Sequence, residues 1–525
     1  MKRHHSVRRS GTLIPLFSLR RGAGWGLGEI PDLVDMAAWS SAAGIRVIQM
    51  LPVNAVSGGE TSPYSASTAF AIDPVYLGLD ACEDFRAVGG RAALADTDRR
   101  LLDEVASAAS VRWNELRAIK DRAMRLAYAH FAAHSGRAAR RGQTLATFRK
   151  ENRHWLEDWA LFAALHRHYE RHWRDWPVGL AERNPAALRK AHAAHADEIA
   201  FIVWQQWQLD RQWREARAAA EAMGVELMGD LPFVVAEDSA DVWKHRELFR
   251  PGLRVGAPPD ALCAEGQDWG LPLFDWRAMN ETGFAWMRAR AARAGRLFGL
   301  YRVDHVIGLY RTYYRSADGS KSGFSPSDEE AQIRLGETVL ALMNEHGEVI
   351  AEDLGMIPEF LRPSLTRLGL PGYRVLRWEK DDLWRDGRMQ AFFRDPKGWP
   401  AISVATSGTH DTPTQATWWD SLSPDDRRNL LRIPGLGHLD PNRGFDDQAR
   451  DALLEVLYQS SSNLCLLPFQ DLLGQREQVN FPGSVSERNW TYRMPMTLDA
   501  LGADGATTQR LRRLASESNR LAPSR

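Results

Sequence analysis

Three carboxylates that follow short apolar runs are the residues of this sequence best suited to chemistry. Asp304 stands in the stretch LYRVDH, Glu352 in IAEDLG and Asp411 in SGTHD. Burying a carboxylate costs several kcal/mol unless it is paired, so each of these residues needs a reason to stand beside a core strand. A lone Asp at a strand end is more often a cap or half of a surface ion pair. Three on three strands favour a shared site.

Arg302 is the expected partner of Asp304. Residues two apart in a strand point to the same side, and the fixed charge of an arginine keeps a neighbouring carboxylate ionised at neutral pH. Cleavage of a glycosidic bond needs this kind of set. One carboxylate attacks the anomeric carbon, while a protonated one delivers a proton to the leaving oxygen. A third can support the oxocarbenium-like transition state.

The elements that must position these residues are eight β-rich apolar runs, most of them followed by Gly, Pro or a charged residue and then by a stretch of helical period. They span 12–19, 45–53, 225–235, 299–308, 348–355, 373–379, 401–411 and 464–474. Such alternation predicts an α/β fold, a (β/α)8 TIM barrel with helical insertions between strands. Its active face lies at the C-terminal ends of the strands, where the three carboxylates would converge.

We expect one catalytic barrel to span residues 1–525. Residues 82–200 do not fit one strand-helix unit, because they carry several helical segments such as HWLEDWALFAALHRHYERHW. They predict a helical insertion subdomain within the barrel. We interpret residues 236–290 as a loop insertion that lines the substrate groove.

Composition favours a neutral substrate. The 67 basic residues balance 67 acidic ones, so net charge gives no reason to expect nucleic acid or a membrane as a partner. No segment approaches the roughly 18 uninterrupted apolar residues of a membrane helix. Cys82, Cys263 and Cys465 lie far apart without CxxC spacing, which indicates neither a disulfide framework nor a zinc site. A cytoplasmic location is the default expectation.

Several longer motifs resemble the 4-α-glucanotransferases, the amylomaltases and disproportionating enzymes of glycoside hydrolase family 77 in the α-amylase clan. They are SPYSASTAFAIDPVYL (62–77), GDLPFVV (229–235), APPDALCAEGQDWGLPLFDW (257–276), YRVDH, IAEDLG, SGTHD, NFPG (480–483) and ERNWTYR (487–493). The resemblance extends over nearly the whole chain outside the helical insertion. One departure follows SGTHD, where TPTQATWW replaces a commoner pattern, and it leaves acceptor preference open.

The resemblance implies a role for each matched position. Asp304 would be the nucleophile, Glu352 the general acid/base and Asp411 the transition-state stabiliser. The substrate-binding positions would be Tyr64, Asp230, Asp260, Gln267, Trp269, Arg302, His410 and Asn480. The implied reaction transfers a segment of an α-1,4-glucan to the 4-hydroxyl of a glucan or glucose acceptor, with retention. Maltooligosaccharides and α-1,4-glucans would be the partners, and no metal or cofactor would be needed.

Two other interpretations stay open at this point. A hydrolase of the same clan could use the same three carboxylates, because only the relative access of water and sugar to the intermediate separates the two reactions. A catalytically dead barrel could bind glucans without turning them over. The intact set of three carboxylates argues against the second alternative.

Overall fold

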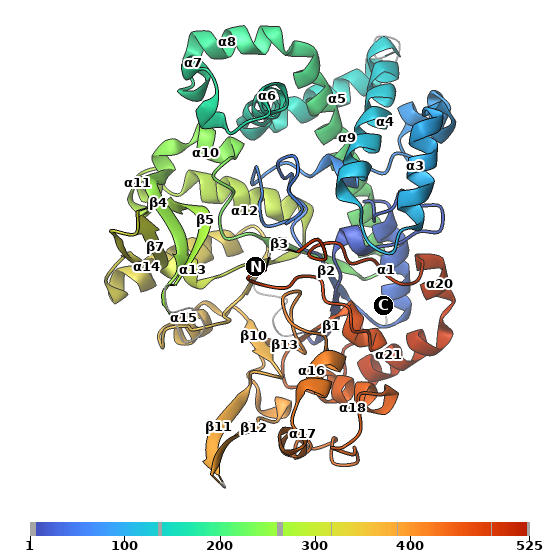
Figure 1. Cartoon of the computed structure of the whole chain (residues 1–525), viewed down its shortest axis with the longest axis vertical. Helices are drawn as coiled ribbons and strands as arrows, with labels where there is room; N and C mark the ends of the chain where they lie inside the picture. The colour runs from blue at the N-terminus through green and yellow to red at the C-terminus, as the bar shows by residue number, and fades with distance from the viewer. Residues whose placement is uncertain are drawn as a thin grey trace.

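A closed barrel of parallel strands forms the centre of the molecule (Figure 1). The structure is a computed structural model, and it describes residues 7–134, 139–259, 266–316, 318–385, 387–484 and 486–521. The barrel strands are β1 (Arg9–Leu13), β2 (Val47–Gln49), β3 (Glu226–Leu231), β6 (Leu300–Val303), β9 (Glu348–Ala351), β10 (Gly372–Val375), β13 (Ser403–Thr406) and β14 (Leu464–Pro468). Their order is β1-β14-β13-β10-β9-β6-β3-β2, which closes through the parallel pairing of β1 with β2. The predicted TIM barrel is confirmed.

The barrel interior is filled by side chains that alternate along the strands. Its apolar cluster consists of Val47, Met228, Leu300, Ile350, Tyr373, Val375, Val404, Leu464 and Leu466, all from barrel strands. Residues two positions further along a strand point to the same side. The period of two therefore places Asp230, Arg302 and Glu352 directly above Met228, Leu300 and Ile350, at the C-terminal end of the barrel.

Helices cover the outside of the barrel and fill the long connection between β2 and β3. That connection holds α2 (Glu83–Ala87), α3 (Asp96–Ser107), α4 (Trp113–His134), α5 (Ala139–Glu151), α6 (Arg153–Tyr169), α7 (Val178–Ala181), α8 (Pro185–Ala194) and α9 (Ala196–Ala222). The others are α1 (Asp32–Ala42), α10 (Ala240–Lys244), α11 (Trp276–Glu281), α12 (Ala285–Leu297), α13 (Ile307–Tyr310), α14 (Glu329–Asn344), α15 (Leu361–Leu368), α16 (Gln415–Ser421), α17 (Pro424–Leu430), α18 (Asp447–Tyr458), α19 (Phe469–Leu473), α20 (Leu498–Ala503) and α21 (Gly505–Glu517). In the described ranges, no helix combines the length and the apolar character that crossing a bilayer requires.

Helix α9 anchors the loop that carries Tyr64. The side chain of Gln206 accepts a hydrogen bond from Ile72 N–H at 3.0 Å and donates one to Ile72 C=O at 2.8 Å. Gln212 makes the same two-way contact with the backbone of Gly78. Because each amide satisfies both backbone groups of its partner, the loop is fixed to a long, buried helix.

Two small sheets were not predicted from the sequence. One is antiparallel, with the order β5-β4-β7-β8, and contains β4 (Phe249–Ala257), β5 (Gln267–Phe274), β7 (Thr312–Ser316) and β8 (Ser322–Ser325). Strands β4 and β5 lie in the 236–290 region that was expected to be a loop. The other is a hairpin of β11 (Lys380–Arg385) and β12 (Arg388–Phe393).

The barrel strands are also shorter than the apolar runs that predicted them. The first run was expected at 12–19, but β1 ends at Leu13 and residues Leu16–Ser18 form a 3-10 turn behind Pro15. Proline has no N–H for a sheet ladder, so the strand ends there. The fourth and fifth runs likewise leave the sheet before Asp304 and Glu352.

Candidate active site

Arg302 is the hub of the catalytic face. Its Nη1 lies 2.8 Å from both carboxylate oxygens of Asp230 on β3, and its Nη2 lies 2.8 Å from Oδ1 of Asp304. Burial alone would lower the pKa of Arg302, but the charges of Asp230 and Asp304 outweigh it and raise that pKa well above its usual value. The guanidinium is therefore a permanent positive charge under Asp304, whose side chain is 25% exposed.

Glu352 is held in a different state from Asp304. It follows β9, and its two carboxyl oxygens accept backbone N–H groups from His305 (2.7 Å) and Leu354 (3.0 Å). Burial raises its pKa to about 8, and the charge of Asp304 adds to this rise, while Arg302, 3.8 Å away, and the two backbone hydrogen bonds oppose it. Glu352 therefore carries a proton at neutral pH and can donate it.

The backbone of His305 adopts an unusual conformation to reach Glu352. Its φ of 47° lies in the left-handed region, which residues other than glycine rarely adopt and which often marks functional sites. The imidazole is half-buried, and its ring centroid lies 5.5 Å from that of Phe233 and 4.9 Å from that of Trp269. Burial lowers its pKa to about 4, so the ring is neutral.

Asp411, beyond the end of β13, is an ionised carboxylate with an open side. His410 Nε2 lies 3.2 Å from its Oδ2, and Asn480 Nδ2 donates to its Oδ1 at 2.6 Å. Desolvation would raise the pKa of Asp411, but the charge and hydrogen bond of His410 and the hydrogen bond of Asn480 lower it to about 2. The side chain remains 41% exposed, so it faces the space in which a substrate would lie.

Tyr64 connects the side chains around Arg302 with those around Asp411. Its hydroxyl donates to Asp230 Oδ2 at 2.9 Å, and its ring stacks on that of His410 with centroids 5.2 Å apart and planes 18° apart. Trp490 lies within 5.8 Å of both rings. Trp490 was not predicted as a site residue, and only its place in the motif ERNWTYR could have indicated it.

The predicted groove residues are placed less completely. On β5, the half-buried Trp269 donates from Nε1 to Gln267 Oε1 at 3.0 Å, and its ring contacts that of His305. The structure thus connects Gln267 and Trp269 to the segment that carries Asp304. Asp260 lies outside the described residues.

Nothing in this arrangement of described residues resembles a metal centre, since none of their His, Cys, Asp and Glu side chains form a group of three placed to hold an ion. The site instead contains two carboxyl groups with opposite pKa shifts, raised to about 8 at Glu352 and lowered to about 2 at Asp411. Titratable groups whose environments drive their pKa values apart are typical of an acid and a base at work.

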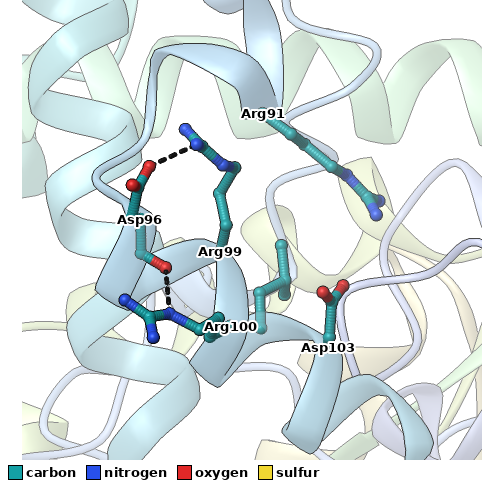
Figure 2. Close-up of a pocket in the computed structure, with 6 residues that line it drawn as sticks. Arg91, Asp96, Arg99, Arg100 and Asp103 are labelled. Atoms are coloured by element: carbon teal, nitrogen blue, oxygen red, sulfur yellow. Dashed lines mark hydrogen bonds and ion pairs between the residues drawn. The ribbon is translucent and has the colours of Figure 1, made fainter.

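A hollow on the surface of α3 is a weaker candidate for the functional site. It has a volume of about 330 Å³ and is lined by Arg91, Asp96, Arg99, Arg100, Leu102 and Asp103 (Figure 2). Three of its charged side chains already have partners in the structure: Arg99 pairs with Asp96, and Arg100 donates to the Asp96 carbonyl.

The fold and the site together define a TIM-barrel enzyme whose carboxylates are arranged for work on glycosidic bonds. The family model described as 4-alpha-glucanotransferase matches residues 14–498, and the chain belongs to that family. Both the predicted family and the predicted class of enzyme are confirmed.

Similar proteins cover nearly the whole chain. A 4-alpha-glucanotransferase of Thermus thermophilus is 33% identical over 474 residues, which are 88% of this chain and 89% of that one. Another, of Chlamydia pneumoniae, is 30% identical over 508 residues, covering 94% and 92%. The solved amylomaltase from Streptococcus agalactiae in complex with acarbose has a TM-score of 0.83 at 23% identity and covers 98% of this chain and 100% of its own. This last likeness concerns the fold alone.

Proposed function

We propose that the enzyme transfers a segment of an α-1,4-glucan to the 4-hydroxyl of another glucan or of glucose, with retention, through an ester on Asp304. The observation that carries this proposal is the pair of opposite pKa shifts on one catalytic face. Burial raises the pKa of Glu352 to about 8, whereas His410 and Asn480 lower that of Asp411 to about 2. Arg302 contacts Asp304 at 2.8 Å and lies 3.8 Å from Glu352. Retaining glycosidases need such a division between a proton donor and ionised carboxylates.

In the first step, Asp304 attacks the anomeric carbon while Glu352 donates its proton to the leaving glycosidic oxygen. The bond between carbon and that oxygen breaks, an ester bond to Asp304 forms, and the shortened glucan leaves with a free hydroxyl. The negative charge of Asp411 stabilises the positive charge that develops on the sugar while one bond breaks and the other forms. Glu352 is then an anion beside Arg302.

In the second step, Glu352 removes the proton from the acceptor 4-hydroxyl, and that oxygen attacks the anomeric carbon. The ester breaks and Asp304 leaves as a carboxylate. Arg302 holds Asp304 through both steps by a direct contact of 2.8 Å. Because the rigid network positions the attacking oxygen before reaction begins, no reorganisation is needed at the transition state.

The other residues of the site bind the sugar chain in this proposal. Tyr64 supplies a ring for the sugar that is attacked, while His410 and Asn480 orient Asp411. The 236–290 region, with Gln267 and Trp269, lines the groove for the rest of the chain, and residue 260 belongs to the same segment. Maltooligosaccharides are the substrates we expect. The boundaries of the helical insertion, the cytoplasmic location and the lack of nucleic-acid and membrane partners stay predictions.

A trapping experiment tests the roles of the carboxylates. Glu352→Gln removes both the acid and the base, so a natural maltooligosaccharide should be almost inert. With α-maltosyl fluoride the leaving group is a fluoride ion, which needs no proton, so the first step still proceeds and the ester should accumulate. Peptide mass mapping should locate it on the peptide that contains Asp304. A label on the peptide that contains Asp411 would exchange the two roles.

A product ladder separates transfer from hydrolysis. With maltotriose as sole substrate, a transferase produces maltotetraose and longer chains together with glucose and maltose. Only glucose and maltose, at every protein concentration, would mean that water takes the glycosyl unit and would overturn the transferase proposal. Binding of maltooligosaccharides without turnover between about pH 5 and 8 would instead favour the dead barrel.

A further inference from the structure

The hairpin of β11 and β12 exposes apolar side chains that its folding does not require. Trp384 is 69% exposed, Met389 is 55% exposed and Leu383 is 42% exposed. The antiparallel register places Trp384 directly opposite Met389, so the two lie side by side on one face of the hairpin. Leu383 points to the other face, so the exposed apolar surface on this face is the pair Trp384 and Met389, and exposed apolar groups of this kind can mark an interaction site.

The base of the hairpin is well anchored, which separates it from the exposed end. Ala391 is buried, and Phe393 packs edge to face on Trp418 with ring centroids 5.8 Å apart. The guanidinium of Arg432 lies 5.4 Å from the ring of Phe392. Trp384 is therefore held on an ordered support rather than on a loose loop.

The hairpin begins at the catalytic face. It connects β10 to β13, and β10 lies between β9, which leads to Glu352, and β13, which leads to Asp411. Figure 1 shows β11 and β12 extending from this point away from the barrel, at the lower edge of the view. The half-exposed Trp378 stands at the base, just beyond β10. The hairpin thus continues the surface on which a glucan would lie.

Charge on the hairpin favours a neutral occupant. Lys380 pairs with Asp382 at 2.8 Å, and Asp381 pairs with Arg394 at 2.6 Å. Trp384 and Met389 contribute no charge. Aromatic rings bind flat apolar surfaces, and the C–H faces of a pyranose ring offer such a surface on an otherwise uncharged polymer.

We propose that Trp384, with Met389 beside it, is a stacking platform for the sugar rings of a long α-glucan whose reacting part occupies the catalytic face. The proposal deepens the function proposed above and rests on it. From Lys380 to Trp384 the strand rises by about 13 Å at ~3.3 Å per residue, which places the platform that far beyond the base of the hairpin, and we therefore expect long glucans to use it more than short ones. It selects for chain length and leaves the chemistry unchanged.

The test compares substrates of different length on the full chain. For Trp384→Ala we expect kcat and KM for maltotriose to stay within about twofold, whereas KM for long-chain amylose rises about five- to twentyfold at unchanged kcat, because uniform binding is lost. Trp384→Phe keeps an aromatic face and should recover most of the affinity. Val178→Ala, at a 70% exposed apolar residue on α7, is the matched control and should change neither substrate.

Each other outcome has a definite meaning. Equal amylose kinetics in Trp384→Ala and the unsubstituted enzyme, or equal losses on both substrates, would overturn the platform. If Trp384→Ala converted a dimer to a monomer in light scattering while amylose KM stayed the same, the patch would be an interface between two copies. Failure of the unsubstituted enzyme to lengthen maltotriose would refute the transferase proposal, and affinity electrophoresis in amylose gels would still test the platform directly.

Discussion

The two ends of the barrel carry similar sets of residues with different properties. At the N-terminal end, Arg9 on β1 contacts Glu226 at 3.2 Å and Glu348 at 2.5 Å. At the C-terminal end, Arg302 contacts Asp230 and Asp304 at 2.8 Å each. Each arginine thus joins carboxylates from different parallel strands, and each is nearly inaccessible, at 3% and 6% exposure.

The difference lies in a third carboxyl group, because Glu226 and Asp304 are exposed to the same extent, 26% and 25%. At the N-terminal end, burial would lower the pKa of Arg9, but Glu348 and Glu226 together raise it, which makes a structural ion-pair set. At the C-terminal end, Glu352 lies 3.8 Å from Arg302, yet burial raises its pKa to about 8. An arginine among carboxylates, even a partly exposed set, therefore does not identify an active end. A carboxyl group whose raised pKa keeps its proton beside that arginine does.

The largest expected effect comes from a substitution at the C-terminal end of the barrel. Asp304→Asn should lower kcat by at least about 10⁴-fold, since removal of a nucleophile leaves only binding and electrostatic assistance. Glucan affinity should stay within about tenfold, because the nucleophile contributes mainly to the transition state. Steady-state kinetics and calorimetric titration measure the two. A variant with more than a tenth of the original kcat would show that another carboxylate attacks.

Substitution of each arginine by lysine tests the two ends of the barrel separately. Arg302→Lys replaces a planar fork by a point charge that cannot hold Asp230 and Asp304 together. We expect kcat/KM to fall roughly 30- to 1,000-fold, which corresponds to about 2 to 4 kcal/mol of activation free energy. Arg9→Lys should lower Tm while kcat/KM stays near normal. Normal kinetics in Arg302→Lys would demote that residue to a packing role.

The pH dependence isolates Glu352. The first step needs its protonated form, so kcat/KM for maltotriose should fall about tenfold per pH unit above pH 8. The release of fluoride from α-maltosyl fluoride needs no proton and should lack this alkaline limb. A maltotriose profile that stays flat to pH 9.5 would mean that another group supplies the proton.

The sequence contains the local signals for the barrel but not for everything around it. Apolar runs with helical stretches between them predict the order of the eight strands, and a motif at a strand end predicts Asp304. The sheet of β4, β5, β7 and β8 depends on pairing between distant, partly exposed segments, and β4 is interrupted by bulges that remove its alternation. The hairpin had a usable signal, since WRDGRM contains the Asp-Gly pair typical of tight turns.

The residue types of the site were predictable from the sequence, but their pKa values were not. A motif can indicate that Glu352 is a catalytic acid, yet its pKa depends on burial and on the backbone N–H of His305, a residue whose φ is positive. Trp490 also has a positive φ, of 62°, although no glycine marks the position. Such conformations are imposed by tertiary packing, which one sequence does not reveal.

The last expected effect is on stability, and it differs between the two ends of the barrel. The pKa of Glu352 is raised from its ordinary 4.5 to about 8. The folded protein therefore binds this proton more tightly than the unfolded chain, and the corresponding stability is present below about pH 4.5 and lost as pH rises through 8. Glu352→Gln resembles the protonated form at every pH. With these two pKa values it should gain up to about 4 kcal/mol over the unsubstituted enzyme between pH 5 and pH 8.5.

Only the change with pH tests this argument, because an amide nitrogen cannot accept a backbone N–H and the lost hydrogen bond costs a similar amount at both pH values. The matched variant at the other end is Glu348→Gln, which replaces a charged partner of Arg9 by a neutral one and should lower Tm at both pH values. Thermal unfolding of both variants at the two pH values provides the measurement. If Glu352→Gln instead lost stability between pH 5 and pH 8.5, Glu352 would be an ionised partner of Arg302 in the free enzyme, and the two ends of the barrel would be alike.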